Sequence, residues 1–137
     1  MKKANLTFVD FIVPSFAFEK TFILEKDELI LEPTAFISRN NEQFHINIKL
    51  EIKDLESEFI LKILAIGTFK YDTDREEELL SFVSINGPAI IFPYIRSFIA
   101  STTSQTGLNT ITLPTLNLSG YKEELIANMV DLDTEGE

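Results

Sequence analysis

The sequence predicts an α+β domain in which strands occupy the first half of the chain and helices the second. Residues 44–52 alternate apolar and polar side chains for five cycles, which is the period of a strand with one buried face. After Asp72 the apolar residues recur three and four positions apart, as in an amphipathic helix. The connection at 54–58 is short, and parallel neighbours would need a crossover of about a dozen residues. The predicted sheet is therefore antiparallel.

Four strands are predicted, over residues 6–13, 16–24, 44–52 and 59–71. Pro14 separates the first two, because proline cannot donate a hydrogen bond to a strand ladder. Segment 25–41 is expected to be irregular. Gly67 lies within the fourth strand, where a glycine predicts a bulge or a close approach of another part of the chain.

The fourth predicted strand is apolar on both of its faces. One face carries Leu61, Ile63 and Ala65, and the other carries Ile60, Leu64 and Ile66. An antiparallel sheet commonly leaves one face polar. We therefore expect the chain's own helices to cover one face and a partner subunit to cover the other.

The second half is predicted to be helical. Asp74 is a candidate N-cap, followed by three glutamates where the helix dipole favours negative charge, and Asn86-Gly87 is expected to end this first helix. Pro88 suits the first turn of the next helix, and Pro93 predicts either a kink or a later start. One side of that helix is an apolar stripe formed by Ile91, Ile95, Phe98 and Ile99.

A long aliphatic connection follows, at residues 105–118. Structureless loops of this length are uncommon and often functional. A final helix is predicted to start at Ser119, and the acidic segment 131–137 is expected to be disordered. Residues 1–130 are thus read as a single domain, as the length of 137 residues favours.

Composition excludes several classes of function. The net charge of −10 disfavours nucleic acid as a partner, and the absence of cysteine removes disulfides, thiolate metal sites and thiol nucleophiles. His45 is the only histidine and lies in the polar phase of a strand. The acidic residues at 72–78 are interpreted as helix capping and not as a calcium loop, which needs a different spacing. We expect no enzyme activity, metal or cofactor.

The sequence also predicts a cytoplasmic protein. The basic start of the chain is interrupted by acidic residues and proline before any apolar core, unlike a signal peptide. The most apolar window, 85–100, contains Gly87, two prolines and Arg96 and is judged too short for a membrane span.

The segment from Pro88 to Asn117 resembles the SecB family of protein-export chaperones. The resemblance rests on Phe92-Pro93-Tyr94 with Arg96, on Thr106-Gly107, and on Leu113-Pro114 with Asn117; Gly67-Thr68-Phe69 is similar to the family's pattern in the long strand. It extends over nearly the whole chain. The resemblance implies a four-stranded antiparallel sheet with two long helices on one face, assembly as a dimer of dimers, and ATP-independent binding of unfolded preproteins that pass to the SecA motor.

Two sets of site residues follow from this resemblance and from the aliphatic loop. A groove for unfolded clients is predicted at Phe92, Tyr94, Leu108, Ile111, Leu113 and Leu116. The family docks SecA through acidic residues on its sheet, and the matching positions here are Ser15, Glu19 and Lys62. Only Glu19 keeps its charge. An alternative partner is therefore an antitoxin of a toxin–antitoxin system, and a third reading is a structural protein that keeps the fold without chaperone activity.

We also expect a homo-oligomer, a tetramer before a dimer, with residues 88–104 in one interface. A monomer would leave aliphatic groups in water at roughly 25 cal/mol per Å². The predicted interface residues are Leu61, Ile63, Ala65, Ile95, Phe98 and Ile99.

Overall fold

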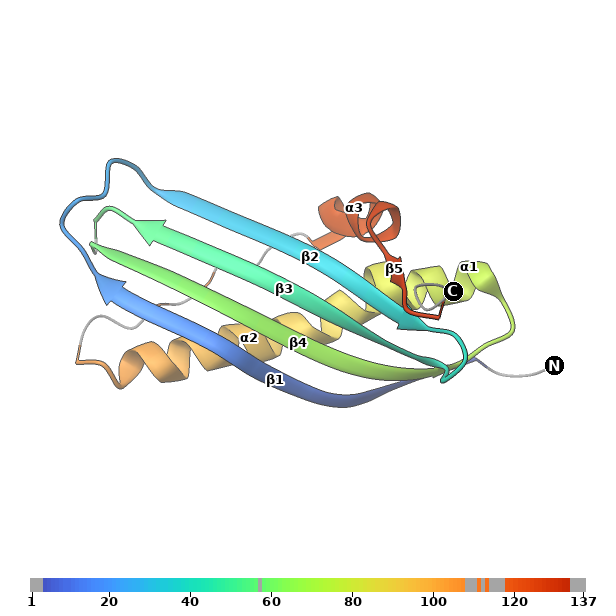
Figure 1. Ribbon diagram of the computed structural model, residues 1–137. Coiled ribbons are helices and arrows are strands. Elements are labelled where there is room, and N and C mark those ends of the chain that lie inside the picture. Colours follow the sequence, from blue (N-terminus) through green and yellow to red (C-terminus); the bar gives the residue numbers. More distant parts are fainter. Residues whose placement is uncertain (1–3, 57, 108–110, 112, 114–117, 134–137) are drawn as a thin grey trace.

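The computed structural model describes residues 4–56, 58–107, 111, 113 and 118–133. Within these ranges the chain forms a five-stranded sheet with the order β1-β4-β3-β2-β5 (Figure 1). The strands are β1 (Asn5–Lys20), β2 (Glu28–Ser38), β3 (Gln43–Asp54), β4 (Phe59–Asp72) and β5 (Val130–Asp131). The α+β class is confirmed. The prediction of four antiparallel strands needs correction, because β5 adds a short strand parallel to β2.

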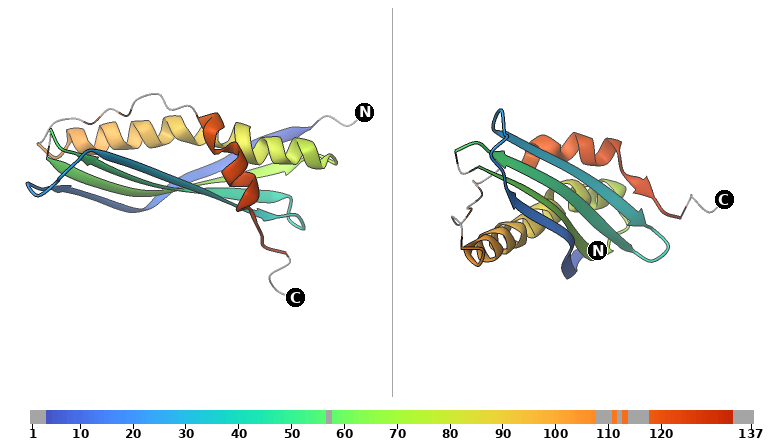
Figure 2. Two further views of the ribbon diagram at one scale, coloured as in Figure 1. Left: turned by 90° about the horizontal axis from the view of Figure 1, so that it is seen from above. Right: turned by 60° about the vertical axis from the view of Figure 1, so that its left-hand side comes forward.

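The helices lie on one side of this sheet (Figure 2). They are α1 (Glu76–Ser81), the π-helical turn η1 (Phe82–Asn86), α2 (Gly87–Ser104), the 3₁₀ turn η2 (Leu118–Tyr121) and α3 (Lys122–Ala127). The first three are continuous, so Asn86-Gly87 does not end a helix as predicted. The second long helix that was expected is only the six-residue α3.

Gly87 serves close packing instead of helix termination. A Cβ at this position would lie 2.7 Å from Cδ1 of Ile46 and 3.0 Å from the carbonyl oxygen of Phe82.

The N-cap of α1 is Arg75 and not Asp74, and Thr73 Oγ1 accepts a hydrogen bond from the Arg75 N–H. Pro93 lies inside α2. A π-helical turn absorbs local irregularity within a continuous helix.

The joined helix Glu76–Ser104 is long and apolar enough to cross a membrane by length and composition, contrary to the estimate from the sequence. Its apolar stripe packs on the chain's own sheet, and Ile91, Ile95 and Ile99 are fully buried there. A core helix passes the same test of length and hydropathy.

Two strand predictions were wrong, and both concern segments that contain a proline. β1 continues through Pro14, with register shifts between Phe8 and Asp10 and between Ile12 and Ser15. Segment 25–41 is not irregular, since it contains β2, which pairs with β3 from Glu28 to Ser38 and includes Pro33. Both prolines lie where the described sheet has no further strand beside them, and edge strands tolerate proline.

The predictions for β3, β4 and the turn between them are confirmed. Gly67 marks a close approach: a Cβ there would lie 2.6 Å from Cδ1 of Ile91 on α2. The core lies between this sheet face and the helices, and its largest fully buried side chains include Phe44, Phe69, Ile46, Leu61, Ile95 and Leu125.

The start of the acidic tail is ordered, which corrects the expectation for residues 131–133. Arg39, just after β2, contacts Glu76 through two hydrogen bonds of 2.6 and 2.7 Å and Asp131 through one of 3.1 Å. Asp133 accepts hydrogen bonds from Ser38 Oγ and from the Asn40 N–H. Arg39 therefore ties together the β2–β3 turn, the start of α1 and β5.

Arg39→Gln is expected to lower the free energy of unfolding by roughly 1 kcal/mol at low salt, because these ion pairs are partly solvent-exposed and screened. Arg39 lowers the pKa of Glu76 through its hydrogen bonds. The stability from this pair is thus fully present above the ordinary pKa of 4.5 and is lost as the pH falls through the lowered pKa.

Denaturant unfolding from pH 7 to pH 3 checks this. The difference in the free energy of unfolding between the wild-type chain and Arg39→Gln should shrink as the pH falls through the lowered pKa of Glu76. Lys26→Gln is the matched control, since Lys26 pairs with Glu28 but is 77% exposed. An equal loss in both variants, or a difference that does not change with pH, would contradict the assignment.

Candidate functional site

An aromatic seam lies between α2 and β1, and we define it as Phe8, Phe11, Phe16, Tyr94 and Phe98. Ring centroids are 5.1 Å apart for Phe8 and Tyr94, 5.4 Å for Phe11 and Tyr94, and 5.2 Å for Phe16 and Phe98. The Tyr94 side chain is 46% exposed. The seam thus offers a partly exposed aromatic surface along one flank of the molecule.

The two bulges of β1 build this seam. Side chains alternate between the faces of a strand, so Phe8 and Phe11 would point to opposite faces in a regular strand. One extra residue between Phe8 and Asp10 and another between Ile12 and Ser15 reset the alternation. Phe8, Phe11 and Phe16 consequently all face α2. The sequence reasoning missed them, although the three-residue spacing of Phe8 and Phe11 was a signal of a phase change.

The predicted client groove is divided between core and surface. Phe92 and Leu113 are buried, with 6% and 2% of their surface exposed, whereas Tyr94 is exposed. Ile111 is half-buried, and its N–H donates a 2.9 Å hydrogen bond to Thr103 Oγ1 on α2. Leu108 and Leu116 lie outside the described residues. Of the four predicted groove residues in the described part, Tyr94 is the one that is exposed.

The predicted interface residues lie in the chain's own core. Leu61, Ile63 and Ala65 on β4 are at most 4% exposed, and Ile95 and Ile99 on α2 are fully buried against that sheet face. These five side chains have no surface to give to another subunit. Phe98 is half-buried and contacts Phe16 at the seam.

The helix-free side of the sheet, here called the open face, carries the three positions that match the family's SecA-docking residues. Ser15 lies opposite Leu64, Glu19 opposite Ile60, and Ala17 opposite Lys62. Directly opposed residues of antiparallel strands point to the same side, so Ser15, Glu19 and Lys62 share this face. The aliphatic residues Ile12, Ile60, Leu64 and Ile66 lie on it as well.

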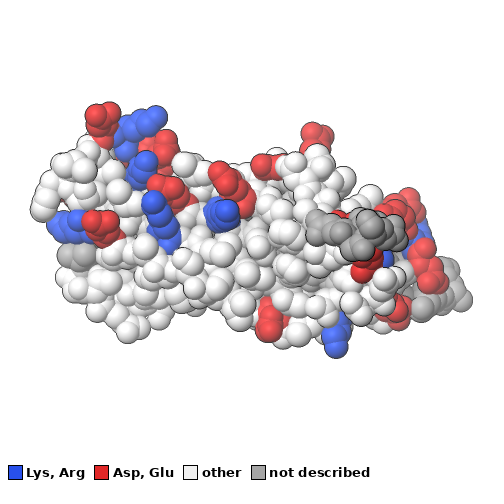
Figure 3. All heavy atoms as spheres, in the orientation of Figure 1, with Lys and Arg blue, Asp and Glu red and all other residues white. Residues whose placement is uncertain are grey.

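Charges on the open face are balanced in cross-strand pairs. Glu28 lies opposite Lys53, Glu32 opposite Lys49, and Glu51 opposite Lys62. Lys53 Nζ is 3.4 Å from Glu28 and 3.8 Å from Glu51. In Figure 3 red and blue spheres mix over the upper left of this face, whereas its lower edge is mostly white. The face has no excess of negative charge at the position of Lys62.

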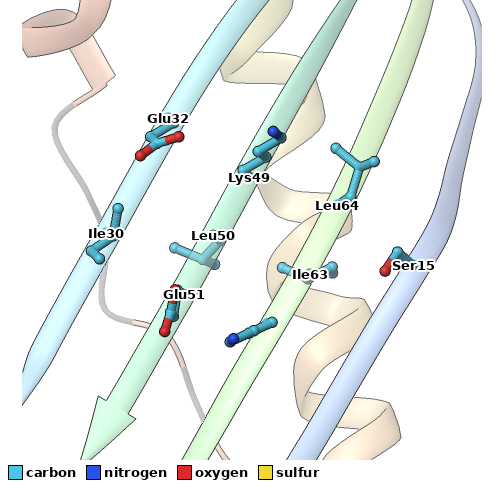
Figure 4. Close-up of a pocket in the computed structure, with 9 residues that line it drawn as sticks. Ser15, Ile30, Glu32, Lys49, Leu50, Glu51, Ile63 and Leu64 are labelled. Carbon is cyan, nitrogen blue, oxygen red and sulfur yellow. The ribbon is translucent and has the colours of Figure 1, made fainter.

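A shallow hollow of about 340 Å³ opens between these pairs. Figure 4 shows Glu32 and Ile30 on β2, Lys49 and Glu51 on β3, Leu64 on β4 and Ser15 on β1 around it. Its apolar floor and alternating charges suit a polypeptide with both kinds of residue.

His45 also lies on the open face, stacked on Phe36 with ring centroids 5.0 Å apart. Burial lowers the pKa of His45. Among the described residues, no group of three acidic, histidine or cysteine side chains is placed to hold a metal ion.

The described residues thus form an α+β sheet covered on one face by helices, with an aromatic seam along one flank and a helix-free opposite face (Figure 2). Residues 32–127 match the family described as preprotein translocase subunit SecB. The chain belongs to the SecB family, which is a family of chaperones.

Relatives support this membership at moderate identity. A protein-export protein SecB of Anaplasma phagocytophilum is 33% identical over 63% of this chain and 56% of its own length. A SecB of Roseobacter denitrificans is 30% identical over 58% of this chain and 49% of its own length. The chain therefore spans about half the length of these curated SecB proteins. An uncharacterised protein of Methanocaldococcus jannaschii is 28% identical over 97% of this chain and 90% of its own length.

The fold is also that of a solved SecB-like chaperone. The SecB-like chaperone of Mycobacterium tuberculosis, solved with a ChAD peptide from the HigA1 antitoxin, superposes with a TM-score of 0.64. The two chains are 19% identical, and the match covers 82% of this chain and 88% of that one.

Proposed function

We propose that this chain is an ATP-independent holdase, which binds unfolded preproteins in the cytoplasm and keeps them competent for Sec-dependent export. The observation that carries the proposal is the aromatic seam with the exposed Tyr94. Aromatic side chains offer large contact areas without demanding a particular partner sequence. Each apolar client side chain buried there contributes on the order of 1.5–3 kcal/mol, so several weak contacts give binding that is still reversible.

A refolding assay with a slow-folding preprotein tests this function. Stoichiometric amounts of the chain should slow refolding without ATP, and Tyr94→Ser should weaken the effect several-fold because it removes the exposed ring of the seam. Ile85→Ser is the matched control, since Ile85 is 44% exposed on η1 and lies outside the seam. An unchanged refolding rate with the wild-type chain would refute the holdase.

A chaperone dedicated to one partner, such as an antitoxin, is the second candidate. The balanced charges around Lys62 favour it, because a basic docking segment gains little from a surface of net zero charge. The complex of the Mycobacterium tuberculosis neighbour with an antitoxin peptide is a precedent in the same fold. Toxin and antitoxin genes beside this one would favour the dedicated role, and an isolated locus would favour general export.

We also propose a homotetramer that uses the exposed side of α2. This side carries the small residues Ala89, Ser97 and Ser101 together with Pro93, which would let another helix approach closely. Light scattering at micromolar concentration should give a mass near four times 15.6 kDa. A mass near 15.6 kDa would refute the assembly.

A further inference from the structure

Thr103 continues the buried apolar series of α2 with a polar side chain. Ile91, Ile95, Ile99 and Thr103 follow one another at intervals of four residues, which places successive members on the same side of a helix. All four side chains are fully buried. A buried hydroxyl group costs free energy unless it is hydrogen-bonded, and an aliphatic side chain would fill this position without that cost. The hydroxyl group of Thr103 therefore needs a partner that justifies it.

The hydroxyl group of Thr103 joins α2 to the connection that follows the helix. It donates to the carbonyl oxygen of Ile99 at 2.7 Å, with that of Ala100 further away at 3.5 Å, and it accepts the Ile111 N–H at 2.9 Å. The bond to Ile99 is not needed by the helix, because a carbonyl in an α-helix already accepts the backbone N–H four residues later. Threonine bonds of this kind do not strengthen a helix. The bond from Ile111 is the one that reaches another segment.

The backbone of Thr103 holds the same connection at a second point. Its carbonyl oxygen accepts hydrogen bonds from the Thr106 N–H at 3.2 Å and from Thr106 Oγ1 at 2.7 Å. Gly107 then has a φ of 82°, in the left-handed region that favours glycine. The chain thus turns at the end of α2 and is bonded to Thr103 again at Ile111. Leu113 follows and is part of the core.

Ser84 on η1 provides a comparison within the same molecule. It is the other buried polar residue of the described part, and its Oγ donates to the Leu80 carbonyl, one turn earlier, at 2.6 Å. Among the described residues it has no partner from another segment. Thr103 and Ser84 therefore differ in one respect, which is the bond that Thr103 accepts from the connection.

We propose that Thr103 is a positioning residue of the client groove, whose hydroxyl group fixes the connection beside α2 before a client arrives. The inference rests on the proposed chaperone function, because this connection carries most of the predicted groove residues. Thr103 is fully buried and touches no client itself. A groove wall that is already ordered loses less conformational freedom on binding, so the client is bound more tightly.

Hydrogen exchange of the Ile111 amide, followed by NMR spectroscopy, tests the bond directly. Thr103→Val keeps the shape of the side chain and removes the acceptor. The Ile111 amide should then exchange at least tenfold faster relative to the Ile63 amide in the inner strand β4, which reports global unfolding. Thr103→Ser keeps the hydroxyl group and should retain the protection within threefold. Ser84→Ala, the matched control, should leave the exchange at Ile111 unchanged.

Client affinity separates a positioning role from a merely structural one. Fluorescence anisotropy with a labelled, unfolded preprotein is measured at a temperature at which circular dichroism shows all variants to be folded. The dissociation constant should rise about fivefold in Thr103→Val. It should stay within twofold of the wild-type value in Thr103→Ser, because the hydroxyl group is restored, and in Ser84→Ala.

Three results would overturn the role of Thr103. The first is unchanged exchange at Ile111 in Thr103→Val, and the second is equal acceleration at Ile111 and Ile63, which would indicate global stability alone. The third is faster exchange at Ile111 with unchanged client affinity, since the bond would then hold the connection without serving the groove. These results leave the holdase intact when the wild-type chain binds the preprotein. Failure of the wild-type chain to bind it refutes the holdase and the role of Thr103 together.

Discussion

Leu113→Ala is expected to lower the free energy of unfolding by about 2–5 kcal/mol. Leu113 comes from the long connection after α2, yet only 2% of its side chain is exposed and it belongs to the core cluster. Truncation to alanine loses the buried methyl groups and leaves a cavity that the neighbours fill only in part. Leu113→Ser should lower the free energy of unfolding further, because it would also bury a hydroxyl group.

Denaturant unfolding checks this, with Ile111→Ala as the control in the same connection. Ile111 is half-buried, so its truncation should cost clearly less. A stable Leu113→Ala chain that binds clients poorly would instead place Leu113 in the client groove, as the sequence suggested. If Leu113→Ala instead lowers the free energy of unfolding, this side chain packs the connection against the core.

Gly67→Ala is expected to destabilise the chain by about 1–3 kcal/mol, which is the usual cost of overpacking. The added Cβ would lie 2.6 Å from both Cδ1 and Cγ1 of Ile91. Ile91 is fully buried, so a rotation away from the added Cβ would press it against other core side chains. The strain falls on the contact between β4 and α2, which holds the helix layer on the sheet.

A double-mutant cycle with Ile91→Ala separates this contact from other effects. Ile91→Ala removes both clashing atoms, so Gly67→Ala should cost far less in that background than in the wild-type chain. Gly120→Ala is the control, because a Cβ there meets no atom within 4 Å. If Gly67→Ala cost the same in both backgrounds, the close approach would not be the reason for glycine at this position.

Regular periods made part of this fold predictable from the sequence. The alternation from Phe44 to Ile52 identified β3, and the apolar run from Phe59 to Tyr71 identified β4. The stripe with Ile91 and Ile95 correctly identified the buried side of α2, although Ile95 was assigned to a subunit interface and lies against the chain's own sheet. In these elements each residue's local preference agrees with its tertiary surroundings, so the local sequence pattern is sufficient to predict the element.

The errors fall where tertiary packing overrides a local signal. Pro14 indicated a strand break, and segment 25–41, which contains Pro33, was expected to be irregular. Both prolines lie on parts of the sheet where no further described strand needs a hydrogen bond from these positions. Asn86-Gly87 resembled a helix stop, whereas Gly87 lets the start of α2 lie close to Ile46. The bulges that turn Phe8 and Phe11 toward Tyr94 depend on pairing with β4, which is distant in sequence. The seam was therefore missed.

The parallel pairing of β5 with β2 has a consequence for the order of folding during synthesis. β2, β3 and β4 follow one another with short connections, so they can pair as soon as they emerge from the ribosome. β5 is synthesised nearly a hundred residues after β2. Until then, the backbone of β2 at Phe36 and Ile37 lacks the strand with which it pairs in the folded chain. A nascent chain thus exposes this short stretch of strand edge, which can pair with other chains, until Val130 and Asp131 have been synthesised. During that interval the nascent chain is prone to aggregate, as are the unfolded chains that its family binds.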